Sequence, residues 1–176
     1  TKVVVLKKGE EYRAKAVVLA MGAVHKKAGV DGEDAMEGKG VSYCATCDGL
    51  FFKDKTATVV GGGNTALEDA VYLAGICEKV YLIHRRDEFR GARHEVEKVL
   101  ANPKIEILYD TVPLAIEGES MVSKLKIKNV KTEEEKTLFT SAVFVAVGLV
   151  PQNDIFAGKV DMDGGYIAAG ESCVTN

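Results

Sequence analysis

A glycine-rich turn between a short apolar strand and a helix is the feature that most limits how this chain can fold. Residues 56–60 (TATVV) form a largely β-branched run, which is typical of a buried parallel strand. The next six residues (GGGNTA) fit G-x-G-x-x-G/A, the pattern of a dinucleotide-binding loop, although a glycine string alone also fits a simple helix entry. We expect this loop and the helix N-terminus to hold a pyrophosphate. The candidate residues are Gly61, Gly62, Gly63, Asn64, Thr65 and Ala66.

Helices and strands are predicted to alternate after this turn. A helix should run from Asn64 to a stop at Gly75, and a second helix should run over 90–100 with Leu100 facing inward. Residues 80–83 (VYLI) indicate a second buried strand, and residues 105–108 (IEIL) indicate a third strand. The order strand-helix-strand-helix-strand within about 50 residues predicts a parallel, doubly wound sheet.

The remaining segments indicate a second kind of sheet. Polar-alternating runs over 113–117, 121–130 and 136–139 have no helices between them, so an antiparallel meander is expected. Residues 142–147 return as an apolar strand. Near the start, strands are predicted over 3–6 and 16–19, followed by an irregular connection over 21–40. The predicted class is α/β: a Rossmann-like nucleotide-binding domain with a parallel sheet and an antiparallel β-meander.

Charge and composition exclude several classes of protein. The chain has 23 Lys and Arg against 26 Asp and Glu, a net charge of −3, which argues against a nucleic-acid binder or a polybasic membrane protein. No stretch approaches about 18 uninterrupted apolar residues, and no apolar signal segment starts the chain, so a cytoplasmic location is expected. The chain begins at Thr1 and stops at Asn176 in a glycine-rich stretch, which suggests an excerpt of a longer protein.

Arginines are concentrated at one place. Four of the five arginines in the chain lie within residues 85–93, just after the second strand of the nucleotide-binding pattern. An NAD site usually has Asp or Glu there, whereas guanidinium groups suit the 2′-phosphate of NADPH. The alternative is a solvated helix start in which Arg85 or Arg86 pairs with Asp87 or Glu88. We favour NADPH, with Arg85, Arg86 and Arg90 as ligands.

Two of the four cysteines form a Cys-x-x-Cys pair, Cys44 and Cys47, while Cys77 and Cys173 stand alone. Three interpretations are open: half of a zinc site, two inert thiols, or a redox dithiol, and we expect no metal site. The redox interpretation is favoured beside a strand-helix-strand pattern. Asp48 follows the pair and could pass protons, although an Asp there is often only a turn or cap residue. A flavin usually relays electrons from NADPH to a disulfide, yet the sequence has no second glycine fingerprint for one.

Three motifs together closely resemble bacterial low-molecular-weight thioredoxin reductase: residues 41–49 (VSYCATCDG), 61–66 (GGGNTA) and 84–90 (HRRDEFR). The resemblance covers essentially the whole chain, and CATCD is its most specific element. It implies NADP(H) and FAD as cofactors, thioredoxin as partner and a homodimer of the full-length protein. It also implies a partial FAD-domain segment over 1–22, an NADPH-binding domain with the redox pair over 23–148, and another partial FAD-domain segment over 149–176. A fragment of this kind is expected to be inactive alone.

The resemblance also implies roles for single residues. Cys47 would be the thiol nearest the flavin, Cys44 the thiol that attacks the disulfide of thioredoxin, and Asp48 the general acid. Arg85, Arg86 and Arg90 would clamp the 2′-phosphate beside His84, and Gly148 would join the cofactor site near a hinge. The alternatives are a peroxiredoxin-reducing flavoprotein and a nucleotide-binding module with a structural cysteine pair.

Overall fold

The computed structural model describes residues 1–176, which form two compact units. Unit 1 comprises Thr1–Val24 and Val150–Asn176, and unit 2 comprises His25–Leu149. All of the buried hydrophobic residues of the core, from Val41 to Val145, belong to unit 2. None of the helices has the length and apolar character needed to cross a membrane.

A five-stranded parallel sheet forms the centre of unit 2. Its order is β4-β11-β5-β6-β7, and every neighbouring pair is parallel. The strands are β4 (Val41–Ser42), β5 (Thr56–Gly61), β6 (Lys79–Ile83), β7 (Ile105–Leu108) and β11 (Ala142–Ala146). The α/β class predicted from the sequence is confirmed. Because all five strands run the same way, their carboxyl ends meet at one edge of the sheet.

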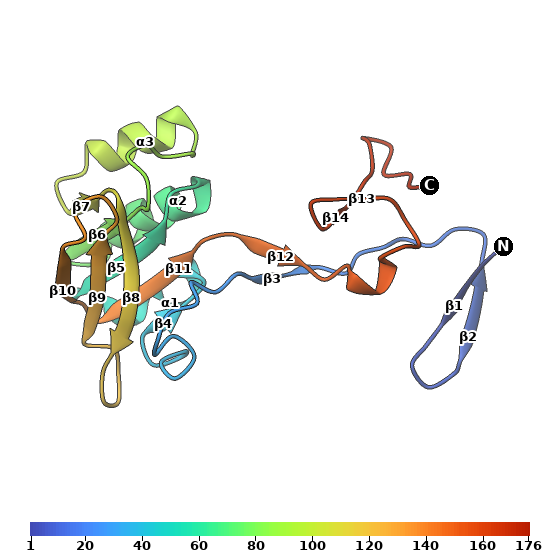
Figure 1. The fold of residues 1–176 in the computed structure, drawn as a ribbon, viewed down its shortest axis with the longest axis horizontal. Helices are drawn as coiled ribbons and strands as arrows, with labels where there is room; N and C mark the ends of the chain where they lie inside the picture. The colour runs from blue at the N-terminus through green and yellow to red at the C-terminus, as the bar shows by residue number, and fades with distance from the viewer. The chain divides into compact units, whose positions relative to one another are not determined.

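Two helices cover one face of this sheet, as Figure 1 shows for α2 (Asn64–Ala74) and α3 (Arg93–Leu100). The predicted stripe of α2 is buried and packs on alternate residues of β5 and β11, such as Val59 and Phe144. The helix α3 begins three residues later than predicted, and Leu100 is 61% exposed, so its inward placement was wrong. The late start has a local cause, because the preceding loop bonds to Gly62 and Asn64 instead of coiling.

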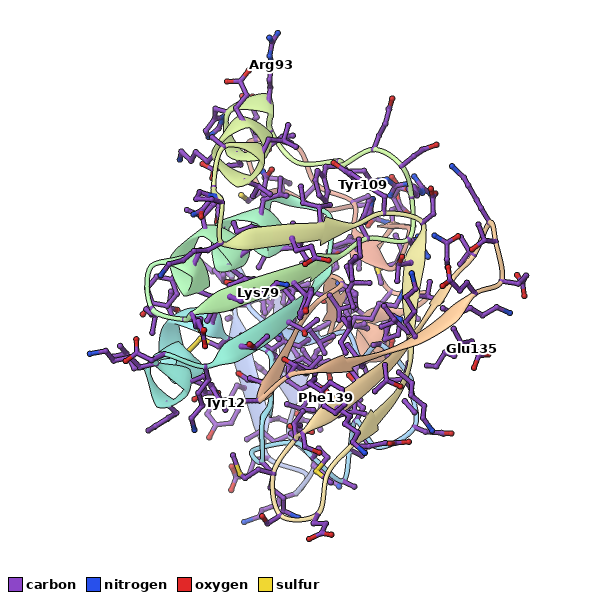
Figure 2. All side chains as sticks on the ribbon, turned by 90° about the vertical axis from the view of Figure 1, so that its left-hand side faces the viewer. Tyr12, Lys79, Arg93, Tyr109, Glu135 and Phe139 are labelled. Carbon is purple, nitrogen blue, oxygen red and sulfur yellow. A yellow bond between two sulfur atoms is a disulfide. The ribbon has the colours of Figure 1, made fainter.

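The predicted antiparallel meander is present, and it packs on the other face of the parallel sheet. It consists of β8 (Thr111–Glu117), β9 (Lys124–Asn129) and β10 (Glu135–Phe139), in the order β10-β9-β8. Ile116, Leu125 and Ile127 form a second core with Val60 and Val143. Figure 2 shows Glu135 and Phe139 at the two ends of the edge strand β10.

Shorter elements complete the two units. Unit 2 contains α1 (Ala45–Asp48) and the 3-10 helix η1 (Gly49–Phe52). The short strands β3 (Ala23–His25) and β12 (Leu149–Pro151) pair with each other. The elements of unit 1 are β1 (Lys2–Val5), β2 (Glu11–Ala14), the 3-10 helix η2 (Asp154–Phe156), β13 (Met162–Asp163) and β14 (Tyr166–Ile167).

The strand predicted over 16–19 is not formed. The strands β1 and β2 form an antiparallel hairpin. The Leu6 N–H donates to Glu10 O at 2.8 Å, which closes a tight turn, so the second strand of the hairpin starts at Glu11. Residues 16–19 carry no strand, and Val18 is 89% exposed. The hydrophobic run was therefore misread, because a strand needs a partner as well as β-branched residues.

A buried carboxylate fixes the irregular segment over 26–40. Glu33 is only 2% exposed and accepts hydrogen bonds from the Ala28 N–H (3.0 Å) and the Gly29 N–H (2.7 Å). The Tyr43 hydroxyl donates to the same carboxylate at 3.0 Å. Because Tyr43 directly precedes Cys44, Glu33 ties this segment to the cysteine pair.

We expect Glu33→Ala to lower the free energy of unfolding by about 2–4 kcal/mol, because two amides and a phenol lose their acceptor inside the protein. Denaturant unfolding would measure the loss. The matched control is Glu37→Ala, which removes a half-exposed partner of Lys27 and should cost at most about 1 kcal/mol. Equal losses in the two variants would contradict this role of Glu33.

Candidate functional site

The glycine turn joins β5 to α2 in a space too narrow for side chains. Gly61 has a φ of +156°, and a Cβ there would overlap Ala146 O and the Cβ of Ala66. A Cβ at Gly62 would overlap the ring of His84, whereas Gly63 faces open space. No side chain caps α2, so its first backbone N–H groups are available to an anion. The turn is therefore shaped for close approach of a phosphate.

A cavity of about 530 Å³ lies in unit 2 at the carboxyl ends of β5, β6 and β11. This is the edge where doubly wound proteins bind nucleotides. The predicted residues that line it are Gly61, Gly62, Gly63, Thr65, His84, Arg85, Arg86, Arg90 and Gly148. Two predicted residues do not line the cavity. Ala66 is buried beneath Gly61, and Asn64 Oδ1 accepts a hydrogen bond from the Ala92 N–H.

The arginine loop, defined as residues 84–92, is bonded to the glycine turn at two points. The Arg90 N–H donates to Gly62 O at 2.8 Å, and the Ala92 N–H donates to Asn64 Oδ1 at 2.7 Å. A Cβ at Gly91 would overlap the side chain of Leu67 on α2. These contacts place the arginines beside the turn that would hold a pyrophosphate.

The three arginines of the cavity form no ion pair, so the alternative of a self-paired helix start is not what the structure shows. Asp87 pairs with Lys131 at 2.9 Å, and Glu88 pairs with no cation. The remaining arginine of the cluster, Arg93, pairs with Glu97 on α3 and projects outward, as Figure 2 shows. The cavity therefore has exposed guanidinium groups that can bind an anion.

His84 is a neutral, buried neighbour of these arginines. Its Nε2 lies 2.9 Å from Glu88 O, and since a carbonyl only accepts, Nε2 carries the proton. Burial lowers the pKa of the ring below its usual value, and the nearby positive charges of Arg86, Arg85 and Arg90 lower it further. The ring packs against Phe89 and beneath Gly62, so His84 shapes the cavity without adding charge at neutral pH.

Cys44 and Cys47 form a disulfide, with their Cα atoms 5.3 Å apart. Cys44 is half-buried at the start of α1, and its Sγ accepts a hydrogen bond from the Cys47 N–H at 3.2 Å. Cys47 is exposed. A backbone N–H aimed at Cys44 Sγ would stabilise a thiolate there once the disulfide is reduced.

Asp48 is held by a buried serine at the end of β4. The Ser42 hydroxyl donates to Asp48 Oδ2 at 2.6 Å, and the Cys44 N–H donates to the same hydroxyl oxygen at 3.1 Å. Ser42 thereby links the carboxylate to the backbone of the first cysteine. The arrangement fixes Asp48 near the pair, where a proton donor would be needed.

The structure does not bring the cysteine pair into the nucleotide cavity. None of residues 41–52 lines that cavity. No cluster of three or more His, Cys, Asp or Glu residues is arranged to hold a metal ion. Of the two remaining cysteines, Cys77 is buried, whereas Cys173 is exposed and is not a packing residue. The cavity and the disulfide therefore occupy separate places in unit 2.

Sequence patterns missed part of the cavity. Two groups come from segments without a motif: Lys26, Lys27, Ala28 and Val30 from the irregular connection, and Thr111, Val112 and Pro113 from the start of β8. The pairing of Lys26 N–H with Gly148 O, at 3.0 Å, brings the first group to the cavity. The adjacent lysines Lys26 and Lys27 were the one sequence feature that could have indicated an anion-binding role for this segment.

Comparison with known proteins agrees with this geometry. The sequence profile described as pyridine nucleotide-disulphide oxidoreductase matches residues 1–176. Thioredoxin reductase from Peptoclostridium acidaminophilum is 44% identical over 178 residues, covering 96% of this chain and 56% of the relative. Thioredoxin reductase from Helicobacter pylori is 47% identical, covering 87% and 50% respectively. The crystal structure of Lactococcus lactis thioredoxin reductase superposes with a TM-score of 0.90 at 32% identity, covering 99% of this chain and 58% of that one.

The lowered pKa of His84 predicts a pH dependence. Because the unfolded chain takes up this proton more readily, the ring should reduce stability as pH falls below its ordinary pKa of about 6.5 and have no such effect above it. Titration of the ring by NMR should give a pKa below about 6.5. Between pH 7.5 and 5.5, the free energy of unfolding should fall less for His84→Gln than for the parent, because the variant lacks the group whose pKa differs between the folded and unfolded states. A ring that titrates at or above the ordinary value would contradict this assignment.

Proposed function

Because the chain belongs to the pyridine nucleotide-disulphide oxidoreductase family, we propose that it is the NADPH-binding, dithiol-bearing part of a thioredoxin-disulfide reductase. The observation that carries the proposal is the presence, in one unit, of a nucleotide cavity with unpaired arginines and a Cys44–Cys47 disulfide. The chain spans about half the length of the curated relatives it matches. We assign residues 23–148 to the NADPH domain, and 1–22 and 149–176 to the flanking FAD domain.

The cavity fits NADPH. The glycine turn and the uncapped start of α2 would hold the pyrophosphate, and Arg85, Arg86 and Arg90 would hold the 2′-phosphate. Gly148 and Lys26 line the same cavity from the β11 side, where the rest of the nucleotide would extend. NADPH supplies a hydride, which carries two electrons.

The residues present do not fit FAD. Residues 1–176 contain a single glycine-rich strand–turn–helix, and it leads into the cavity just described. A flavin needs its own pyrophosphate cradle, so we propose that the rest of the whole protein binds FAD. We therefore expect this chain alone to bind NADPH but not to reduce thioredoxin.

Disulfide exchange is the chemistry of the cysteine pair. Once two electrons and two protons have reduced the pair, the Cys44 thiolate attacks a disulfide sulfur of thioredoxin and forms a mixed disulfide. Cys47 then attacks Cys44 Sγ, which restores the Cys44–Cys47 disulfide and releases thioredoxin with two thiols. We propose that Asp48 donates the proton that the departing thiolate takes up, from the position that Ser42 fixes.

An apolar surface next to the disulfide suits a protein partner. Leu50 and Phe51, which follow Asp48 in η1, are 66% and 75% exposed. Contiguous exposed apolar side chains are typical of interaction sites. We propose thioredoxin as the partner there, whereas a homodimer and a cytoplasmic location of the whole protein rest on the family resemblance.

Two other functions compete with this one. A structural cysteine pair would be buried, whereas Cys47 is exposed, so the structure favours a redox role. A peroxiredoxin-reducing flavoprotein would have a similar nucleotide domain, but the curated relatives named here are thioredoxin reductases. Comparing thioredoxin and peroxiredoxin as substrates of the whole protein would separate these two enzymes.

We expect Arg85→Ala combined with Arg86→Ala to weaken NADPH binding at least about tenfold and to leave NADH binding nearly unchanged, because charge-assisted phosphate contacts contribute about 1.5–3 kcal/mol each. Calorimetric titration of both cofactors would measure this. Arg93→Ala is the control, since Arg93 pairs with Glu97 outside the cavity. Equal losses for NADPH and NADH would show that the two arginines do not bind the 2′-phosphate.

We expect the whole protein with Cys44→Ser and Cys47→Ser to lose thioredoxin reduction while its NADPH affinity stays within about twofold, because the pair lies outside the cavity. Turnover with thioredoxin and NADPH titration would test both parts. Cys173→Ser, at an exposed cysteine, is the matched control and should retain full turnover. Normal thioredoxin reduction by the double variant would refute the proposed function.

A further inference from the structure

Lys131, between β9 and β10, contacts one carboxylate within the arginine loop and a second one after β7. Its ammonium lies 2.9 Å from Asp87 Oδ2 and 3.0 Å from Asp110 Oδ2. Asp87 directly follows Arg86, and Asp110 follows β7. The three residues come from separate segments, so the antiparallel sheet brings its lysine to the nucleotide-binding edge of the parallel sheet.

The two ion pairs of Lys131 hold carboxylates that would otherwise be available to the arginines of the cavity. Asp87 is 71% exposed and adjacent in sequence to Arg86, so without Lys131 its carboxylate could turn to the guanidinium groups. A carboxylate competes with a phosphate for the same planar N–H donors. It would also repel a phosphate dianion in the cavity.

We propose that Lys131 is a positioning residue for NADPH selectivity, which keeps the arginines of the cavity available to the 2′-phosphate by holding Asp87 and Asp110. This inference rests on the proposed function. The side chain of Lys131 does not line the cavity, so it acts through the aspartates and not by touching the cofactor.

Backbone hydrogen bonds also hold this region, besides the ion pairs of Lys131. The Asp110 N–H donates to Arg86 O at 3.2 Å, and the Val130 N–H donates to Asp110 O at 2.6 Å. The arginine loop also has its two bonds to the glycine turn. Removal of the ammonium therefore changes charge while these anchors remain.

The test is calorimetric titration of this chain with NADPH and NADH at low salt. Lys131→Met should raise the Kd for NADPH about five- to tenfold and change the Kd for NADH less than about twofold, because only NADPH carries the 2′-phosphate. Lys126→Met is the matched control. Lys126 is on the same antiparallel sheet, its ammonium lies 2.6 Å from Glu117 Oε1, and neither residue lines the cavity. The variant removes the same charge and should change neither Kd.

Two further variants separate the mechanism from its alternatives. Lys131→Arg should keep the parent affinity, and Asp87→Asn added to Lys131→Met should recover most of the lost NADPH affinity. An unchanged Kd in Lys131→Met, an equal loss for NADH, or no recovery with Asp87→Asn would each overturn the role of Lys131. A parent chain that binds NADPH and NADH equally would instead overturn the proposed cofactor.

Discussion

Two hydrogen bonds join the arginine loop to the glycine turn, and the shape of the cavity in unit 2 depends on them. The Arg90 N–H reaches Gly62 O, and the Ala92 N–H reaches Asn64 Oδ1. Since a Cβ at Gly62 would overlap His84 of the loop and a Cβ at Gly91 would overlap Leu67 on α2, the turn and the loop pack against each other directly. The glycine turn and the three arginines thereby become parts of one cavity.

The disulfide depends on a different set of contacts, which explains why the two chemistries are separated. Ser42 orders Asp48 and the backbone of Cys44, and Glu33 ties the preceding Tyr43 to the irregular segment. Burial and the bond to Glu33 raise the pKa of Tyr43 well above its ordinary value, so its hydroxyl remains a donor. None of these residues lines the cavity, so the proposed transfer of electrons from NADPH to the cysteine pair would need a relay.

Local patterns predicted the parts of the structure that depend on local physics. The β-branched run before Gly61 and the apolar stripe of α2 specify burial by themselves, and both are correct. Residues 16–19 and 90–92 show the limit. A strand needs a partner strand, and the loop before α3 bonds to Gly62 and Asn64 instead of extending the helix, and neither contact can be read from spacing. Lys26 reaches the cavity and Lys131 reaches Asp87 of the arginine loop through contacts between distant segments, for which the sequence has no motif.

The central claim is that the glycine turn and the arginine loop together bind a 2′-phosphorylated adenine dinucleotide. It can be tested most directly by calorimetric titration of this chain with adenosine 2′,5′-bisphosphate and with adenosine 5′-monophosphate, which differ only in the 2′-phosphate. The account predicts binding of the bisphosphate in competition with NADPH, at least about tenfold tighter than the monophosphate. Equal affinities for the two nucleotides, or bisphosphate binding that NADPH does not displace, would contradict it.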